Sequence, residues 1–224
     1  MYRARTLFLD RLDAARRLAS RLSHLKAQHP LILAIPRGAV PMGKVIADAL
    51  DGELDVVLVH KLGAPDNPEY ALGAVSEDGS VYFDEGAAPY RRADLDDEIQ
   101  AELTVLRERR KRYTPVRAPA DPAARTVVVV DDGSATGRTM TAALKTLRPR
   151  GPGRLIAALA VAPADVVDEL ERLADVVVCL DTPSPFHAVG EFFADFHQVS
   201  DEEVVACLRE AAAKAGMNGH SQSP

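Results

Sequence analysis

The sequence has no tryptophan, and aromatic residues of all kinds make up only 5% of its 224 residues. A chain with so few aromatic side chains must build its core mainly from Ala, Val, Leu and Ile, which suits a parallel sheet covered by helices. The content of 47% hydrophobic and 27% charged residues is that of an ordinary globular protein. A chain of this length can form one compact domain with a substantial core, so we expect a single α/β domain.

Cysteine, positive charge and long apolar stretches are also scarce. Cys179 and Cys207 stand in no metal-ligand spacing, so we expect buried thiols in a reducing compartment rather than a disulfide framework. The net charge of −6 argues against a general nucleic-acid binder, because phosphate backbones are bound by an excess of Lys and Arg. No segment approaches the roughly 18 apolar residues of a membrane span, and no secretion signal is recognisable near the N-terminus. We therefore expect a cytoplasmic protein that binds neither nucleic acid nor membranes.

Short apolar runs alternate with helical patterns along most of the chain, an order typical of a parallel sheet. The runs that predict strands are 31–35, 55–60, 126–130, 155–161 and 176–180. The patterns that predict helices are 10–28, 41–50, 93–113, 137–147, 163–173 and 201–213. Segments 71–76 and 80–83 flank Asp78-Gly79, a strong hairpin-turn pair, so we expect a hairpin that interrupts the alternation.

The loop Asp131-Asp132-Gly133-Ser134-Ala135-Thr136-Gly137-Arg138-Thr139 joins a buried strand to a helix. Ligands of open parallel sheets bind at this edge, beyond the carboxyl ends of the strands. Backbone amides of a small-residue loop can converge on one phosphate, and the hydroxyl groups and the helix N-terminus add donors and positive potential. The two carboxylates need hydroxyl groups or a cation as partners, because they repel a phosphate. A sugar phosphate offers both a phosphate and a diol.

Other phosphate-binding loops fit this segment less well. Gly133 and Gly137 enclose three residues and are followed by Arg138, whereas a P-loop has four residues before its Gly-Lys pair. No GxGxxG follows a predicted strand, which argues against a dinucleotide-binding fold. A loop with a purely structural role would need small residues, but not two adjacent acids followed by Thr-Gly-x-Thr. These comparisons favour a sugar-phosphate site.

DDGSATGRTM resembles the motif that binds 5-phosphoribosyl-1-pyrophosphate (PRPP) in type I phosphoribosyltransferases. The resemblance implies that Asp131 and Asp132 hold the ribose 2- and 3-hydroxyls, and that the loop from Gly133 to Thr139 holds the 5-phosphate. Ser134 stands where the family usually has an apolar residue, and its backbone amide would still serve the phosphate.

IPRGAVPMG, residues 35–43, is similar to the pyrophosphate loop of the same family. There a strained peptide at the positions of Arg37 and Gly38 presents amides to the leaving group. HKLGAPDNPEYALGAV, residues 60–75, resembles a subgroup of small bacterial members of undefined substrate, which implies that Lys61 neutralises pyrophosphate. That subgroup usually has Arg where this chain has His60.

The C-terminal segment PFHAVGEFFADFHQVSDEEV resembles the same subgroup, so the similarity covers nearly the whole chain. It implies a three-layer type I phosphoribosyltransferase fold, with a parallel five-stranded sheet flanked by helices, the added hairpin and a small C-terminal hood segment. We divide the single domain 1–224 into a core at about 26–182, a C-terminal segment at 183–213, which is the hood, and a flexible tail at 214–224. Members of the family are often dimers, so a homodimer is one of the open predictions.

Transfer from PRPP breaks a bond at the anomeric carbon through an oxocarbenium-like state, so catalysis should rest on binding pyrophosphate and excluding water. Lys61 and Arg37 are the candidate catalytic residues, since their charges would stabilise the leaving group. Mg²⁺ is the expected cofactor, bound through PRPP and water rather than directly by side chains. The segment 82–92 lies where the family has a mobile lid, from which Arg91 and Arg92 would close over pyrophosphate.

The acceptor is not identified by the sequence. The hypoxanthine and guanine enzymes of the family carry an Asp at the position of Ala135, so a 6-oxopurine is disfavoured. Stacking on a flat base and ordinary core packing explain the C-terminal phenylalanines equally well; these are Phe186, Phe192, Phe193 and Phe196.

We favour an enzyme that transfers phosphoribose to a base or amine. A non-catalytic PRPP-sensing regulator and a sugar-phosphate hydrolase or isomerase are the alternatives. A regulator that bound DNA would be expected to show a basic face, and we interpret the basic run 107–112 as a solvated helix end. A hydrolase would need a clear pair of nucleophile and base, which the sequence lacks.

Overall fold

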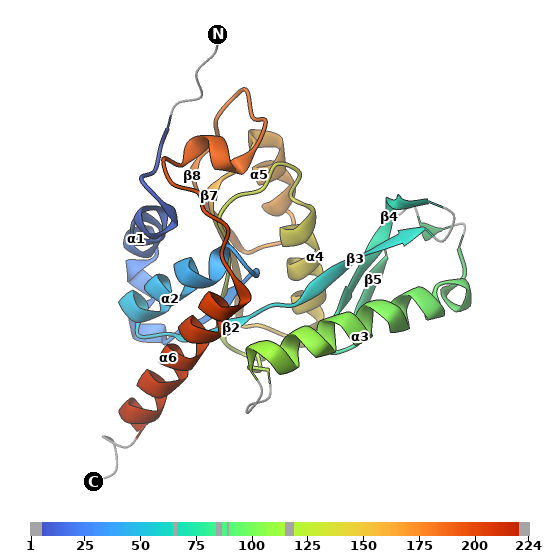
Figure 1. Ribbon diagram of the computed structural model, residues 1–224, viewed down its shortest axis with the longest axis horizontal. Helices are drawn as coiled ribbons and strands as arrows, with labels where there is room; N and C mark the ends of the chain where they lie inside the picture. The colour runs from blue at the N-terminus through green and yellow to red at the C-terminus, as the bar shows by residue number, and fades with distance from the viewer. Residues whose placement is uncertain (1–5, 65–66, 84–86, 89, 115–118, 220–224) are drawn as a thin grey trace.

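A computed structural model describes residues 6–64, 67–83, 87–88, 90–114 and 119–219 of the protein (Figure 1). Its centre is a five-stranded parallel sheet in the order β2-β1-β6-β7-β8. The strands of this sheet are β1 (Leu31–Ala34), β2 (Glu53–Val56), β6 (Thr126–Asp131), β7 (Arg154–Val161) and β8 (Val176–Asp181). The predicted α/β class with five parallel strands is therefore confirmed.

Helices cover both faces of the sheet, which gives the predicted three layers (Figure 1). The α-helices are α1 (Arg11–Arg21), α2 (Ala39–Leu50), α3 (Asp96–Tyr113), α4 (Arg138–Leu147), α5 (Ala164–Leu170) and α6 (Asp201–Gly219). Short 3₁₀ helices are η1 (Ser23–Gln28), η3 (Arg92–Asp94), η4 (Arg148–Arg150) and η5 (Val189–Phe192). α1, α2 and α6 share one hydrophobic core with the sheet, and α4 and α5 share the other.

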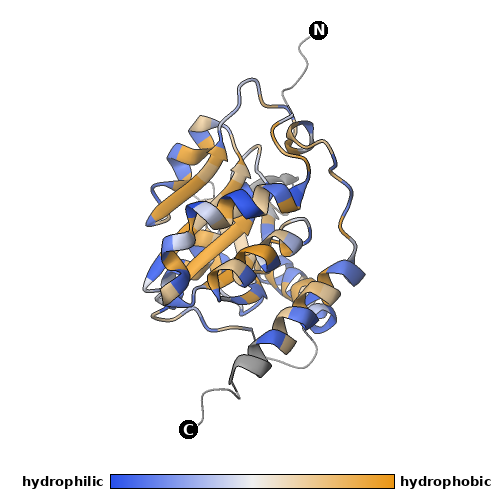
Figure 2. Ribbon diagram, turned by 90° about the vertical axis from the view of Figure 1, so that its left-hand side faces the viewer, coloured by the Kyte–Doolittle hydropathy of each residue, from blue (hydrophilic) through white to orange (hydrophobic). Residues whose placement is uncertain are grey.

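The apolar run of β6 explains why this strand lies at the centre of the sheet. Val128 and Val130 belong to the core beneath α1 and α2, whereas Val127 and Val129 belong to the core beneath α4 and α5. All four side chains are fully buried, and each contributes about 1.5–3 kcal/mol of hydrophobic stabilisation. Figure 2 shows the same pattern, with hydrophobic strands inside and helices that turn hydrophilic residues outward. Within the described residues, none of the helices has the length and apolarity needed to cross a membrane.

The prediction of one strand at 55–60 is wrong, because two strands from different sheets share that apolar run. β2 ends at Val56, and β3 (Val59–Ala64) begins a second, antiparallel sheet with β4 (Asn67–Ser76) and β5 (Val81–Phe83). Val57 and Leu58 between them are buried in opposite cores, so no polar residue marks the break. The predicted hairpin is confirmed as β4 and β5, and Figure 1 shows this small sheet projecting from the core above α3.

Several helix boundaries also differ from prediction: the helix expected at 163–173 ends at Leu170, and the one expected at 93–113 begins at Asp96. The helix expected at 10–28 ends at Arg21 and continues as η1, and the last helix extends beyond 213 to Gly219. The longer helix includes 214–219, part of the segment expected to be a flexible tail, and 220–224 lie outside the described residues. Helix α6 begins with reciprocal bonds, in which the Glu203 amide donates to Ser200 Oγ and the Ser200 amide donates to Glu203 Oε2.

A buried ionic network attaches α3 and the small sheet to the core. The Arg110 guanidinium donates to Asp55 at 2.6 Å, to the Val56 carbonyl at 2.9 Å, and to both carboxylate oxygens of Glu77. Burial raises the pKa of the Glu77 carboxyl, although Arg110 opposes that rise. The network joins α3 to β2 and to the turn before β5, and so holds β3, which carries Lys61, beside the main sheet.

Candidate active site

The predicted phosphate loop lies at the carboxyl edge of the sheet, between the end of β6 and the start of α4. Gly133 has φ of 158°, and a Cβ there would lie 2.7 Å from Val161 Cγ2. Gly137 is the N-cap of α4 with φ of 68°, and a Cβ there would lie 2.9 Å from Val166 Cγ1. Both positions require glycine, because a side chain would meet a neighbouring element and a positive φ strains other residues.

Hydrogen bonds within the loop limit which amides can bind a phosphate. The Ser134 amide donates to the Val161 carbonyl at 3.0 Å, so it is used within the fold, contrary to our expectation for it. The Gly137 amide donates to Ser134 Oγ at 2.9 Å. The remaining candidates for phosphate binding are the exposed residues of the loop and of the first turn of α4; these are Ala135, Thr136, Arg138 and Thr139.

The two predicted carboxylates lie side by side at the start of this loop. The Asp131 carboxylate accepts the amide of Asp132 at 2.9 Å and that of Gly133. Burial, and after it the negative charge of Asp132, raises the pKa of Asp131 well above its ordinary value. Burial also raises the pKa of Asp132. Two adjacent carboxylates with raised pKa values are typical of a functional site, because a core shaped only for stability gains nothing from them.

The strongest contact of Asp132 comes from a residue that the sequence did not point to. Arg11 Nε lies 2.7 Å from Asp132 Oδ2, and the side chains of both residues are nearly buried, at 10% and 13% exposure. The guanidinium lies 3.7 Å from the ring centroid of Phe196, and Nη1 donates to the His197 carbonyl at 2.6 Å. Arg11 begins α1 and lies on the buried face of that helix with Ala14, Ala15 and Leu18, whereas Arg16, Arg17 and Arg21 are exposed.

The predicted pyrophosphate loop meets the same carboxylate. A Cβ at Gly38 would lie 2.2 Å from Asp132 Oδ2, so only glycine allows this approach. The peptide bond between Pro36 and Arg37 is cis. Arg37 is half-exposed, and its Nη1 lies 3.9 Å from Asp201 Oδ1 at the start of α6.

A cavity of about 380 Å³ joins this loop to the C-terminal segment. Its lining combines the charged residues of the site with apolar and amide side chains; the residues are Arg11, Arg37, Gly38, Asp132, Val189, Phe196, Gln198 and Val199. The structure therefore brings Arg37, Gly38 and Asp132 together, as predicted from two separate motifs.

A larger cavity of about 950 Å³ lies between the phosphate loop and the small sheet. Lys61 lines it together with Thr136, Arg138 and Thr139, so the predicted pyrophosphate lysine and the phosphate loop face one space. His60 also lines it, and its Nδ1 is hydrogen-bonded to Glu102 of α3.

Thr141 is a second residue that sequence reasoning missed. Thr141 is among the residues that line the larger cavity, and within the described part of the chain its hydroxyl is a buried side-chain oxygen without a hydrogen-bond partner. A buried hydroxyl is normally paired, so this one is suited to a ligand oxygen or an ordered water.

The C-terminal phenylalanines divide between the core and the site. Phe192 and Phe193 are almost fully buried and belong to the core, where Phe193 packs against Phe8 with a centroid distance of 5.2 Å. Phe196 packs against Phe193 and presents its ring to Arg11. Phe186 packs against Phe192 with a centroid distance of 4.9 Å, so core packing accounts for three of the four, and Phe196 lines the smaller cavity.

Part of the predicted lid lies outside the described residues, namely 84–86 and 89. In the described part, the side chain of Arg91, the N-cap of η3, is bonded to Asp94 at the end of that helix, with Nη2 to Oδ1 at 2.8 Å. Arg92 is exposed. The lid stays a prediction.

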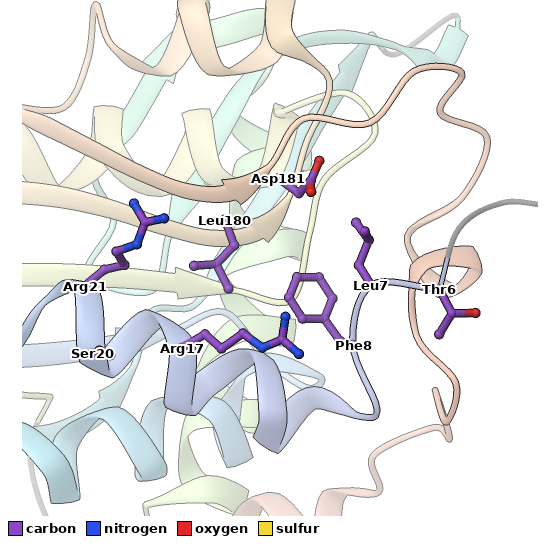
Figure 3. Close-up of a pocket in the computed structure, with 8 residues that line it drawn as sticks. All are labelled: Thr6, Leu7, Phe8, Arg17, Ser20, Arg21, Leu180 and Asp181. Atoms are coloured by element: carbon purple, nitrogen blue, oxygen red, sulfur yellow. The ribbon is translucent and has the colours of Figure 1, made fainter.

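A third cavity, of about 480 Å³, lies away from the loop between the N-terminal segment, α1 and β8 (Figure 3). None of the predicted site residues lines it. Arg17 extends across Phe8 there and is bonded to Asp13, and Asp181 lies at the end of β8.

Comparison with known proteins agrees with this geometry. The family model described as "Phosphoribosyl transferase domain" matches residues 8–196, a range that contains Arg11, both predicted loops and Lys61. The protein therefore belongs to the phosphoribosyltransferase family.

Two curated Mycobacterium tuberculosis proteins and one solved structure are among its relatives. "Putative phosphoribosyl transferase" MT0597 and its counterpart Rv0571c are each 40% identical over 208 residues, which are 92% of this chain and 47% of theirs. The chain thus spans about half the length of these relatives. The crystal structure of TT1426 from Thermus thermophilus is 44% identical, with a TM-score of 0.84 over 91% of this chain and 98% of that one.

Proposed function

We propose that the protein binds PRPP and transfers its phosphoribosyl group to a nitrogen of a base or an amine, with release of pyrophosphate. The observation that carries this proposal is the approach of Gly38 to Asp132. That contact joins the loop predicted for pyrophosphate to the carboxylate predicted for ribose, and two motifs far apart in the sequence form one surface.

Each part of PRPP has a matching group in the site. Asp131 and Asp132 would accept the ribose hydroxyls. The amides and hydroxyls of Ala135, Thr136, Arg138 and Thr139 would bind the 5-phosphate at the start of α4. The loop at Gly38, with Arg37, would contact pyrophosphate, and Lys61 would reach it from the larger cavity. In the reaction, the bond from C1 to the pyrophosphate oxygen breaks, the acceptor nitrogen bonds to C1, and the nitrogen's proton passes to solvent.

The site fits Mg²⁺ that arrives with PRPP. Asp131 already accepts backbone amides and Asp132 already pairs with Arg11, so neither carboxylate is a dedicated metal ligand. Around the expected phosphates, the described residues offer hydroxyl and amide groups rather than a set of carboxylates that would enclose the ion. The unpaired Thr141 hydroxyl, in a residue that lines the larger cavity, would be the kind of group that holds a metal-bound water. When bound, Mg²⁺ would neutralise charge on the pyrophosphate oxygens.

The acceptor would enter beside the hood. The smaller cavity places Phe196, Gln198 and Val199 next to Asp132, so an aromatic ring and an amide face the expected position of the ribose. Because the Arg11 guanidinium covers the Phe196 ring, these groups suit a small acceptor that makes apolar contacts and a hydrogen bond rather than one that stacks on this ring. The homodimer and the cytoplasmic location remain predictions.

A pyrophosphate-release assay tests the transfer. The protein, PRPP and Mg²⁺ are incubated with a panel of bases and amines, and the phosphoribosylated product is identified by mass spectrometry. Release that depends on one acceptor and disappears in Asp132→Asn supports the proposal. Asp181→Asn is the matched control, because Asp181 also ends a strand of the same sheet but lines the third cavity.

The same assay separates the alternatives. Conversion of PRPP to ribose 5-phosphate without any acceptor would instead identify a hydrolase. Binding of PRPP with no turnover across the panel would favour a sensor.

A further inference from the structure

Arg11 connects three parts of the molecule that are far apart in the sequence. It begins α1, forms an ion pair with Asp132 of the phosphate loop, and donates to the His197 carbonyl in the C-terminal segment. Its guanidinium also covers the ring of Phe196. Among the described residues, the polar and aromatic partners of the Arg11 side chain belong either to the candidate site or to the hood.

The N-terminal segment and the hood are themselves held together. The amides of Leu7 and Phe8 donate to the Phe192 carbonyl at 2.9 and 3.0 Å, and the Ala194 amide donates to the Phe8 carbonyl at 2.9 Å. Figure 1 shows the two segments side by side, above α1. Since Arg11 follows this segment directly, its position depends on the hood, and the position of Asp132 depends on Arg11.

The charges around Asp132 come from several elements. Asp131 lies next to it on the loop, Arg11 reaches it from α1, and Arg37 lines the same cavity from the β1–α2 loop. In the hood, the His197 ring is within 3.5 Å of Asp195 and 3.7 Å of Glu203, so those carboxylates are partnered within their own segment. Arg11 is therefore the cation in direct contact with Asp132 among the residues described.

We propose that Arg11 is a positioning residue for PRPP binding, which fixes the Asp132 carboxylate for the ribose hydroxyls and couples it to the hood. This inference rests on the proposed function. A carboxylate can accept about four hydrogen bonds, so the bond from Arg11 Nε leaves capacity for a ribose hydroxyl.

The ion pair predicts a pH dependence. Burial raises the pKa of Asp132, and the hydrogen bond and charge of Arg11 oppose that rise. Without Arg11 the pKa of Asp132 would rise further, so the carboxylate would be protonated at a higher pH. Because the carboxylate accepts hydrogen bonds from the ribose, PRPP affinity would be lost at a correspondingly higher pH.

The test is calorimetric PRPP affinity with Mg²⁺ across the pH range in wild type, Arg11→Met and Arg17→Met. For Arg11→Met we expect affinity lower by about ten- to a hundredfold at neutral pH. We also expect the acidic loss of affinity to move upward by about one to three pH units. The ionisation of PRPP itself is common to all three proteins and cancels in the comparison.

Arg17→Met is the matched control. Arg17 lies on the same helix, forms an ion pair with Asp13 at 2.7 Å and covers the ring of Phe8 at 5.1 Å, but has no contact with Asp132 among the residues described. It should leave both affinity and pH profile as in wild type.

A conservative variant separates charge from geometry. Arg11→Lys keeps a cation but lacks the second donor for the His197 carbonyl. We therefore expect PRPP affinity to be lost at the same acidic pH as in wild type, and the affinity at neutral pH to lie between those of wild type and Arg11→Met. If Arg11→Met does not fold, Arg11→Lys is the test variant. Loss of its PRPP affinity at a higher pH than in wild type would overturn the proposal.

A wild-type PRPP affinity in Arg11→Met would also overturn the proposal. So would a weaker affinity that is lost at the same acidic pH as in wild type, because replacing a residue with a purely structural role gives that result. Absence of PRPP binding in wild type would instead refute the proposed function, and the inference with it.

Discussion

Substitution of Gly38 by alanine is the sharpest steric test of the site. The backbone at Gly38 has φ of −55° and ψ of −37°, which alanine adopts without strain, so the effect of the change comes from the added methyl group alone. That Cβ would lie 2.2 Å from Asp132 Oδ2 and 3.2 Å from Arg11 Nε. Ordinary contact then requires the carboxylate or the loop to move by about 1 Å.

A displacement of that size has a large expected effect on function. Misplacement of a binding group by about 1 Å can reduce a reaction rate by about a hundredfold, and we expect Gly38→Ala to weaken PRPP affinity by a similar factor. The assay is PRPP titration by calorimetry, with thermal unfolding measured in parallel.

Gly153→Ala is the control, because a Cβ there would lie 2.9 Å from the Ala124 carbonyl at the opposite end of the sheet. It should lower stability and leave PRPP affinity unchanged. Wild-type affinity in Gly38→Ala would refute the assignment of this contact to the binding site.

Three further predictions concern stability. Arg110→Met leaves Asp55 and Glu77 buried without their cation, so urea unfolding should show a loss of about 3–5 kcal/mol, and a loss below about 1 kcal/mol would contradict the network's role. Asp131→Asn should make the ligand-free protein more resistant to urea at neutral pH. The pKa of Asp131 is raised in the folded state, so the wild-type protein has its full stability only below the ordinary pKa of 3.8, where this carboxyl is protonated, and loses stability as the pH rises through the folded-state pKa. The gain in Asp131→Asn should therefore vanish in acid, and a pH-independent difference would count against it. Thr141→Val removes a buried, unpaired hydroxyl, so thermal unfolding should show unchanged or higher stability while PRPP affinity falls, and a clear loss of stability would show that the hydroxyl is paired.

The sequence predicted the features whose information is local. The uninterrupted valines of β6 mark a strand buried on both faces, and the loop after it is a contiguous motif, so strand, loop and helix could be placed together. The capping pattern at Ser200 likewise lies within one turn.

The features that could not be predicted depend on distant contacts. Arg11 and Asp132 are separated by 121 positions. Helical spacing places Arg11 on the buried face of α1 with Ala14, Ala15 and Leu18, but nothing in the sequence identifies Asp132 as its partner. The break between β2 and β3 falls within an apolar run, because Val57 and Leu58 are each buried in a different core. The internal use of the Ser134 amide depends on Val161 of the neighbouring strand.

The central claim is that 131–139 binds PRPP, and calorimetric titration of the protein with PRPP and Mg²⁺ tests it most directly. Ribose 5-phosphate and pyrophosphate serve as separate ligand controls, and Asp132→Asn as the variant. We expect saturable, Mg²⁺-dependent PRPP binding that is tighter than binding of either fragment and is lost in Asp132→Asn, with the fold retained. No binding of PRPP by the wild type, or undiminished binding by Asp132→Asn, would contradict the account.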